Sequence, residues 1–275
     1  MEPAIPITRF FAQPDPALLP HVSVDCAVFG FHTGEGELKI LLLRWKHLDT
    51  WSLPGGHVRR DESVDRAAER VLRERTGLDE IYLQQFHTFG GTDRGESVLR
   101  SLATAMGEEM PADHWMADRV VSIGYLGLVN FALVTPAADA LSDECRWWVV
   151  RDCPPLAFDH GDIVAAARQT LRTQANYLPL GLNLLPEKFT MPELQRLHEA
   201  VLGVSLDRRN FQKRMLDLGF IERLPERKTG GAHRAPYLYR FNARASSYRF
   251  SVRAPEGVTD SRAFEIPPAG FRDGA

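Results

Sequence analysis

The chain has 275 residues, 44% of them apolar and 25% charged, and its formal net charge is −3. This fits a soluble globular protein of one large domain or two smaller ones, and it excludes a global basic field for nucleic acid, so any basic patch must be local. Three cysteines without metal spacing argue against a disulfide framework, and with neither a signal peptide nor an apolar run of about 20 residues we expect a cytoplasmic protein without a membrane segment.

The first part of the chain alternates predicted strands and helices. Residues 1–20 are Pro-rich and form an N-terminal segment. The helix predicted over 62–76 has apolar residues at three- and four-residue spacing and is closed by Gly77. Residues 95–117 look like an insertion whose first half is a short helix. The other predicted elements are strands 22–31, 38–45, 81–89, 120–129 and 146–152, and a helix over 159–176.

A second unit begins near residue 180 and is predicted as helix, helix, hairpin. The first helix, 188–203, opens with a capping box of Thr190 and Glu193. The second helix spans 207–219, and the hairpin pairs 220–224 with 237–241. We therefore divide the chain into an N-terminal segment (1–20), a first domain (21–178), a second domain (179–242) and a disordered tail (243–275).

One spaced set of residues stands out in PGGHVRRDESVDRAAERVLRERTGL, residues 54–78. It resembles the Nudix hydrolase signature, which runs Gly, five residues, Glu, seven residues, then Arg-Glu-aliphatic-any-Glu-Glu-any-Gly-aliphatic. The resemblance implies a Nudix fold over about 20–175, an α/β class fold in which an α/β/α sandwich surrounds a mixed sheet. The residues in register are Gly56, Glu62, Arg70, Leu72, Glu74, Gly77 and Leu78.

The acids that would bind metal are mostly missing from this segment. Cleavage of a phosphoanhydride needs divalent cations, and magnesium prefers carboxylate oxygens. Three carboxylates at i, i+3 and i+4 would form one acidic face, but those positions are Val71, Glu74 and Arg75. The guanidinium of Arg75 would repel a metal ion and is expected to pair with Glu74. Ordinary Nudix hydrolysis is therefore not expected, and we predict no catalytic or metal-binding residue.

A scaffold of this kind can still bind a nucleoside diphosphate compound. Arginines after the Gly-Gly pair or at strand ends would meet the phosphates, and aromatic residues, Trp147 among them, would stack on adenine. Simpler interpretations stay open: a structural Glu62–Arg70 ion pair, a plain Gly-Gly turn, solvated arginines and aromatic residues in the core. The predicted effector-binding residues are Arg44, Trp51, Gly55, Gly56, Arg59, Arg60, Glu74, Phe89, Arg119 and Tyr125.

The second domain has the pattern of a winged helix-turn-helix. Phe211, Met215 and Leu218 would face its core, while polar donors project from the N-terminal half of the helix, as major-groove reading requires. Residues 208–234 contain eight Lys or Arg against three acids. The basic charge is thus local, as in a DNA-binding face, although a winged helix can also dock a protein. The predicted DNA contacts are Arg208, Arg209, Gln212 and Lys213 on the helix and Arg227, Lys228, His233 and Arg234 in the wing.

Together, the degenerate box and the basic winged helix resemble the Nudix-related transcriptional regulators of NAD metabolism, over about residues 20–242. The resemblance implies a homodimeric repressor of NAD synthesis or salvage genes that binds a palindromic operator. ADP-ribose or a related nucleotide would be the effector that releases DNA, with no cofactor required. Two features depart from the family: the insertion 95–117 follows Thr88-Phe89-Gly90, where the effector is expected, and the tail after 243 is extra.

Two other classes of function are compatible with the sequence. One is a residual ADP-ribose or nucleotide-sugar pyrophosphatase that uses Glu62 and Glu74, with the Glu108-Glu109 pair in place of a lost ligand. The other is a binding module whose winged helix docks a protein instead of DNA.

Overall fold

A computed structural model of the chain describes residues 16–246 apart from short gaps. The predicted wing residues His233 and Arg234 and the Glu108-Glu109 pair lie in those gaps, outside the described residues. The predicted tail lies outside them from residue 247 onward, and the predicted N-terminal segment up to residue 15. The gaps are residues 47, 79–80, 93, 95, 106, 108–109, 111–113, 116–117, 135, 139–140 and 229–234.

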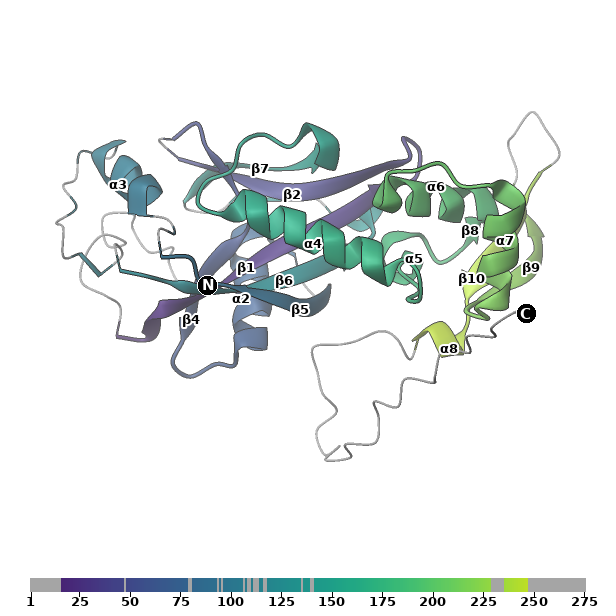
Figure 1. The fold of residues 1–275 in the computed structure, drawn as a ribbon, viewed down its shortest axis with the longest axis horizontal. Coiled ribbons are helices and arrows are strands. Elements are labelled where there is room, and N and C mark those ends of the chain that lie inside the picture. Colours follow the sequence, from purple (N-terminus) through teal and green to yellow (C-terminus); the bar gives the residue numbers. More distant parts are fainter. Residues whose placement is uncertain are drawn as a thin grey trace, which may run out of the picture.

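A seven-stranded mixed sheet forms the centre of the first domain (Figure 1). The long strand β1 pairs in parallel with β6 and antiparallel with β2 and β4. Strand β5 lies beyond β6, and β3 and β7 both pair with β2. The strands are β1 (Leu18–His32), β2 (Glu37–Trp45), β3 (Trp51–Ser52), β4 (Gly55–Arg59), β5 (Tyr82–Phe89), β6 (Val121–Val129) and β7 (Ser142–Val149).

Helices cover both faces of this sheet, because β1 is apolar on both sides. Val24 and Val28 belong to the cluster under α2 (Val64–Thr76), whereas Phe29 and Phe31 belong to the cluster under α4 (His160–Gln174). Period-two alternation in a strand buried on both faces produces this division. The predicted α/β/α sandwich is therefore confirmed. The remaining helices of this part are α3 (Glu96–Ala105) and the 3-10 turns η2 (Phe131–Leu133) and η3 (Val150–Asp152).

Helix α2 begins and ends where its sequence signals place it. The Ser63 side chain accepts a hydrogen bond from the Arg66 N–H at 3.3 Å, which caps the N-terminus. At the other end Gly77 has φ 72°, a left-handed conformation that glycine adopts without strain, and its N–H donates to the Arg73 carbonyl. The Nudix-like segment thus forms β4, a connecting loop and α2.

The second domain combines four described helices with a small three-stranded sheet. The predicted capping box at Thr190 and Glu193 is present at the start of α6. None of the helices in the described part of the chain combines the length and apolar character that crossing a bilayer requires. The elements are α5 (Gly181–Leu184), β8 (Phe189–Thr190), α6 (Met191–Leu202), α7 (Arg208–Asp217), β9 (Ile221–Arg227), β10 (Tyr237–Phe241) and α8 (Ala243–Ser246).

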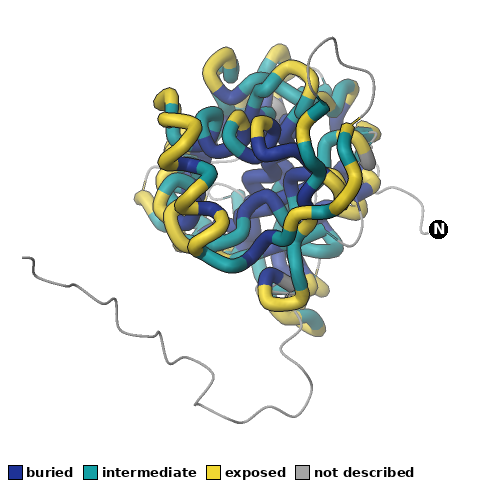
Figure 2. Tube along the Cα trace, turned by 90° about the vertical axis from the view of Figure 1, so that its right-hand side faces the viewer, coloured by how far each residue is buried: buried dark blue, intermediate teal, exposed yellow. Residues whose placement is uncertain are grey.

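One apolar core runs through both domains. The cluster that contains Phe29 and Ile163 in the first domain continues through Leu184 and Leu194 to Phe211 in the second. Figure 2 looks onto the winged-helix end, where buried segments fill the centre and exposed segments form the rim. Helix α4 extends along the sheet toward α5 and α6 and so connects the two ends of the molecule (Figure 1).

Some elements differ from the predicted ones. Strand β1 already begins at Leu18, so the first domain starts earlier than residue 21. Strands β3, β4 and β8 and helices α5 and α8 were not predicted, because none spans more than five residues and such short pieces carry no periodicity. The strand expected over 146–152 is β7, shifted toward the N-terminus and followed by a 3-10 turn.

Candidate functional site

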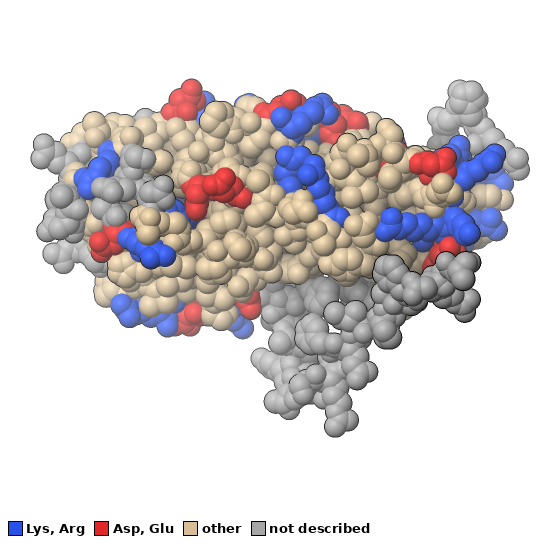
Figure 3. Space-filling model, viewed as in Figure 1, with Lys and Arg blue, Asp and Glu red and all other residues tan. Residues whose placement is uncertain are grey.

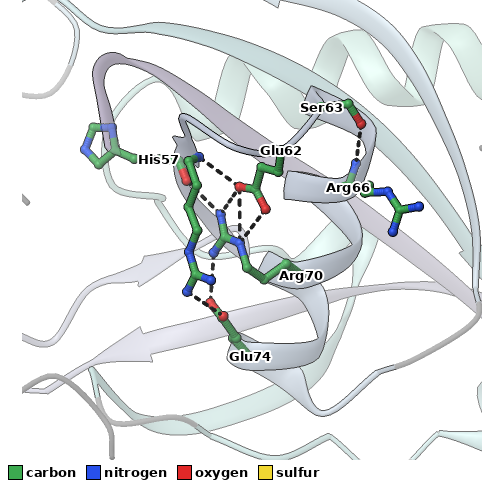
Figure 4. Close-up of polar contacts among 7 residues, drawn as sticks. His57, Glu62, Ser63, Arg66, Arg70 and Glu74 are labelled. Atoms are coloured by element: carbon green, nitrogen blue, oxygen red, sulfur yellow. Dashed lines mark hydrogen bonds and ion pairs between the residues drawn. The ribbon is translucent and has the colours of Figure 1, made fainter. Parts of the chain in front are cut away.

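Glu62 and Arg70 form a structural ion pair at the start of the Nudix-like helix (Figure 4). Arg70 donates to the Glu62 carboxylate from Nε at 2.9 Å and from Nη2 at 2.6 Å. It also donates to the His57 carbonyl at 2.9 Å, which ties the loop to the helix. Burial would raise the pKa of Glu62, but the hydrogen bonds from Arg70 and the Arg59 backbone hold it below its ordinary value. The structural interpretation of this pair is confirmed.

The degenerate metal face does not fit a magnesium ion. Glu74 is held by Arg59 at 3.2 Å and by Arg70 at 2.9 Å. Arg75, which is expected from the sequence to pair with Glu74, is 8% exposed, and its guanidinium carbon lies 5.6 Å from the centroid of the Trp45 ring. Within the described residues, no group of three or more His, Cys, Asp or Glu side chains is placed to hold a metal ion. We therefore derive no step through a metal.

The Gly55-Gly56 pair is not a simple turn, because both residues belong to β4 and allow close packing. A Cβ at Gly55 would lie 2.0 Å from the Asp25 carboxylate, and a Cβ at Gly56 would lie 3.1 Å from Val71. The first glycine therefore faces a buried acid on the α4 side, and the second faces α2.

A buried charge network lies directly under Gly55. Asp25, in the middle of β1, accepts hydrogen bonds from Arg94 at 2.6 Å and from Ser122 at 2.5 Å, and His160 lies 3.3 Å away. Arg94 also donates to Asp159 at 2.7 and 2.8 Å. Burial alone would raise the pKa of Asp25, but His160, Arg94 and Ser122 hold it well below its ordinary value. Asp25, Arg94, Ser122, Asp159 and His160 form what we call the Arg94 network.

The Arg94 network fixes the start of α4. His160 Nδ1 accepts a hydrogen bond from the Leu53 N–H at 2.9 Å, so the other ring nitrogen faces Asp25. Asp159 is the N-cap residue of α4, yet its side chain makes no capping hydrogen bond. Its neighbour Phe158 has φ 57°, a left-handed conformation that costs a bulky residue about 1–3 kcal/mol. The first turn of α4 is therefore positioned by tertiary contacts.

Two predicted stacking residues are corrected by their burial. Tyr125 is 0% exposed, and its hydroxyl donates to Asp65, so it belongs to the core beneath α2 and offers no face to a ligand. Trp51 is 7% exposed and is covered by Trp148 and by the guanidinium of Arg146, whose carbon lies 4.8 Å from the Trp51 ring centroid. The structure thus favours the core-packing alternative at both positions.

The other predicted effector residues lie in several places. Phe89 is half-buried at the end of β5, beside Phe86 and His87. Arg119 donates to the Gly90 carbonyl at 2.6 Å, next to that strand end. Arg44 pairs with Asp143 at 2.8 Å and Arg60 donates to the Pro16 carbonyl at 2.9 Å. The structure therefore does not bring all ten predicted residues into one pocket.

The sequence did carry one signal for the Arg94 network. Asp25 interrupts the stretch VSVDCAVFGF, residues 22–31. All the remaining residues from 24 to 31 are apolar or glycine. A charged residue in a strand buried on both faces must be paired, so it points to a specific partner. The identity of the partners was not predictable, because Arg94 and Asp159 are distant in sequence.

Helix α7 presents a basic face at the far end of the molecule. Arg208, Arg209 and Lys213 are exposed. Phe211 and Met215 are buried, with exposed fractions of 6% and 7%. Asp207 caps the helix by accepting from the Asn210 N–H at 2.9 Å. Gln212 is half-buried. The predicted division of α7 into a core side and a polar side is thus present.

The described wing residues are held at the loop end of the β9–β10 hairpin, where Arg227 pairs with Tyr237. Arg227 donates to the Tyr237 hydroxyl at 2.6 Å, and its guanidinium carbon lies 4.0 Å from the ring centroid. Lys228 donates to Glu193 at 2.6 Å and so supports the capping box of α6. Lys and Arg side chains gather at the winged-helix end of the molecule (Figure 3).

Comparisons with known proteins agree with this architecture. The NUDIX domain family matches residues 19–167, and the NrtR DNA-binding winged helix domain matches residues 181–241. The ADPR responsive transcriptional repressor NtrR of Acinetobacter baylyi is 30% identical over 238 residues, covering 84% of this chain and 86% of the relative.

Two solved structures of a related protein extend the likeness to three dimensions. Shewanella oneidensis NrtR matches with a TM-score of 0.65 and 28% identity, over 83% of this chain and 97% of that one. The same protein in complex with a 27mer DNA matches with a TM-score of 0.63 and 27% identity, over 82% of this chain and 96% of that one. The chain belongs to the family of Nudix-related transcriptional regulators that carry an NrtR-type winged helix domain.

Proposed function

We propose that the chain is an ADP-ribose-responsive transcriptional repressor that binds operator DNA through α7 and the β9–β10 wing. The observation that carries the proposal is the exposed basic face of α7. This helix follows a Nudix domain in which Val71 and Arg75 stand at two of the three metal-binding positions. Arg208 and Arg209 lie in the first turn of the helix and Lys213 follows one turn later, and a recognition helix contacts base edges and phosphates from this end. The proposal places the protein in the same compartment as the DNA that it binds.

The finer parts of the proposal are the effector, the genes and the assembly. ADP-ribose is favoured because the curated relative is named for its response to that compound. We further propose that the regulated genes serve NAD synthesis or salvage. The active form is a homodimer whose two α7 helices read a palindrome about one DNA turn apart.

The ligand response follows from linkage. An effector can release DNA only by binding better to the conformation whose α7 helices are wrongly spaced, and its maximal effect equals that difference in affinity. A nucleotide that is not hydrolysed persists as a signal, which agrees with the replacement of the metal-binding acids by Val71 and Arg75.

Fluorescence anisotropy with the DNA upstream of the protein's own gene tests both the DNA-binding part and the effector part of the proposal. We expect Arg208→Ala with Arg209→Ala to weaken DNA binding by roughly tenfold or more and to reduce the salt dependence, because phosphate contacts release counterions. Arg151→Ala is the matched control: this arginine is 68% exposed on η3 in the first domain. Salt-insensitive binding, or equal loss in both variants, would contradict the DNA half.

Titration of ADP-ribose into the DNA complex tests the effector half. We expect DNA release with the wild-type chain, and sedimentation of the free protein as a dimer. Unchanged DNA affinity at millimolar ADP-ribose would remove ADP-ribose as the effector without affecting the DNA-binding proposal.

A residual pyrophosphatase is less well supported. Both oxygens of Glu74 are taken by arginines, at 3.2 and 2.9 Å. Release of AMP from ADP-ribose in the presence of magnesium, abolished by Glu74→Gln, would revive this alternative.

A further inference from the structure

We propose that Arg94 is the residue that senses the effector: the diphosphate of a nucleotide displaces Asp159 from the Arg94 guanidinium, and α4 carries that change to the winged helix. This inference rests on the proposed function and identifies a contact for the effector that differs from the arginines beside the Gly-Gly pair.

The two carboxylates that share Arg94 are not equivalent. Asp25 is 6% exposed at its side chain and has Ser122 and His160 as further partners. Asp159 is 22% exposed at its side chain, and it forms an ion pair with Arg94. An incoming anion can therefore replace Asp159 while Asp25 keeps its contacts, so that no buried charge loses its partners. Arg94 suits this exchange, because a guanidinium binds carboxylate and phosphate with the same two-pronged geometry.

The position of the network fits a diphosphate subsite. Gly55 packs against Asp25, so the backbone of β4 in the Nudix-like segment lies directly over the network. Arg94 itself follows β5 in the chain, four residues after Gly90, whose carbonyl accepts from Arg119. His57 lies two residues after Gly55 on β4, and burial lowers its pKa. Its Nδ1 is buried without a hydrogen-bond partner among the described residues.

Loss of the Arg94–Asp159 pair would act on the start of α4. The Asp159 carboxylate is committed to Arg94 and does not cap the helix. Phe158, directly before it, is in the left-handed region. A strained residue keeps its conformation only while surrounding contacts enforce it, so removing the Asp159 contact frees this junction to rearrange.

The other end of α4 is fastened to the winged helix. Arg172, in the last turn of α4, donates to the Val201 carbonyl of α6 at 3.3 Å. Arg214, on α7, donates to the Asn176 carbonyl at 2.9 Å, just after α4 ends. The apolar core is continuous across the same junction. A shift of α4 therefore moves α6 and α7 with it, because α4 runs from the middle of the molecule toward α5 and the winged helix (Figure 1).

Asp159→Asn, in the full-length chain, tests the competition directly. The variant keeps the size of the side chain but removes the charge that competes for Arg94. We expect ADP-ribose, titrated by calorimetry, to bind about tenfold tighter or more, the scale of one charge-assisted hydrogen bond. The concentration of ADP-ribose that releases DNA should fall in the same proportion. A merely structural role of Asp159 would weaken binding or leave it unchanged.

Asp162→Asn is the matched control. Asp162 lies in the first turn of the same helix and is exposed, so the substitution removes the same charge near the same helix end. We expect it to change ADP-ribose affinity by less than about twofold, because it does not compete for Arg94. Equal tightening in both variants would mean general electrostatics and would overturn the proposal, as would no tightening in Asp159→Asn.

Arg94→Lys provides a second measurement. A lysine keeps the positive charge that Asp25 needs but loses the planar fork, so we expect ADP-ribose affinity to fall about tenfold while DNA binding without effector is retained. Unchanged ADP-ribose affinity in this variant would overturn the proposal. If the wild-type chain bound no ADP-ribose at all, the effector half of the proposed function would fail first, which is a distinguishable result.

Discussion

Asp25 shows how one buried acid organises the first domain. It is 5% exposed in the centre of β1, and its partners come from β6, from the loop after β5 and from the start of α4. A buried carboxylate without partners would be strongly destabilising, so the cluster must form as a unit. The same acid also requires glycine at position 55, since a Cβ there would overlap its carboxylate.

Asp25→Asn should destabilise the protein in a pH-dependent way. We expect a loss of about 3 kcal/mol near neutral pH, because Arg94 loses a buried charged partner. The folded pKa of Asp25 lies below its ordinary value of 3.8. Its contribution is therefore fully present above that ordinary value and is lost as the pH falls toward the folded pKa. Urea unfolding of wild type and variant between pH 7 and pH 3 should show the two stabilities converging below about pH 4.

Asp162→Asn should not show this behaviour. Asp162 is exposed on the first turn of α4, and such surface substitutions usually change stability by less than about 0.5 kcal/mol. A constant difference between Asp25→Asn and wild type across the pH range would mean that the charge of Asp25 does not stabilise the fold.

Helix α7 illustrates how local sequence signals produce a functional element. Asp207 caps it, Phe211 and Met215 bury one side, and Arg208, Arg209 and Lys213 stay exposed. Helix caps and helical periodicity depend on residues within one or two turns, so the sequence predicted this helix and its basic face before any contact was known.

Asp207→Ala and Asp207→Asn separate the cap from the charge. The Asp207 side chain accepts from the Asn210 N–H at 2.9 Å. Asparagine caps as well as aspartate, whereas alanine leaves that N–H without an acceptor. We expect Asp207→Ala to lower the free energy of unfolding by about 1 kcal/mol and Asp207→Asn to change it by only about a few tenths. Similar losses in both variants, measured by urea unfolding, would show that the charge and not the cap matters.

At the scale of the whole molecule, the two domains share one core. Leu171 of α4 and Leu197 of α6 belong to the same apolar cluster as Phe29 of β1 and Phe211 of α7. Domains joined by a small polar interface move independently by default, but a continuous apolar contact couples them. This coupling is what allows an event at the Nudix end to reach α7.

We therefore expect a single unfolding transition for the full chain. In differential scanning calorimetry the calorimetric and van't Hoff enthalpies should agree, as for a cooperative unit. Two separate transitions would mean that the winged helix unfolds independently of the Nudix domain, and the coupling through α4 would then have to be weak.

The sequence by itself determined the elements that rest on short-range signals. The register of residues 54–78 predicted α2, and Ser63 and Gly77 bound it as capping rules require. The Glu62–Arg70 pair and the core side of α7 were predictable in the same way, because each depends on the residue types at a fixed spacing. The fold class was expected from the resemblance of residues 54–78 to the Nudix signature.

Only the tertiary structure decided which side chains meet. Arg94 is 69 residues from Asp25 and 65 residues from Asp159, so no spacing rule connects them. Tyr125 was expected to meet the effector but is buried, because the packing of α2 on the sheet decides which residues are covered. Periodicity fixes the apolar face of a helix or strand, whereas the partners of a buried charge depend on how distant segments come together.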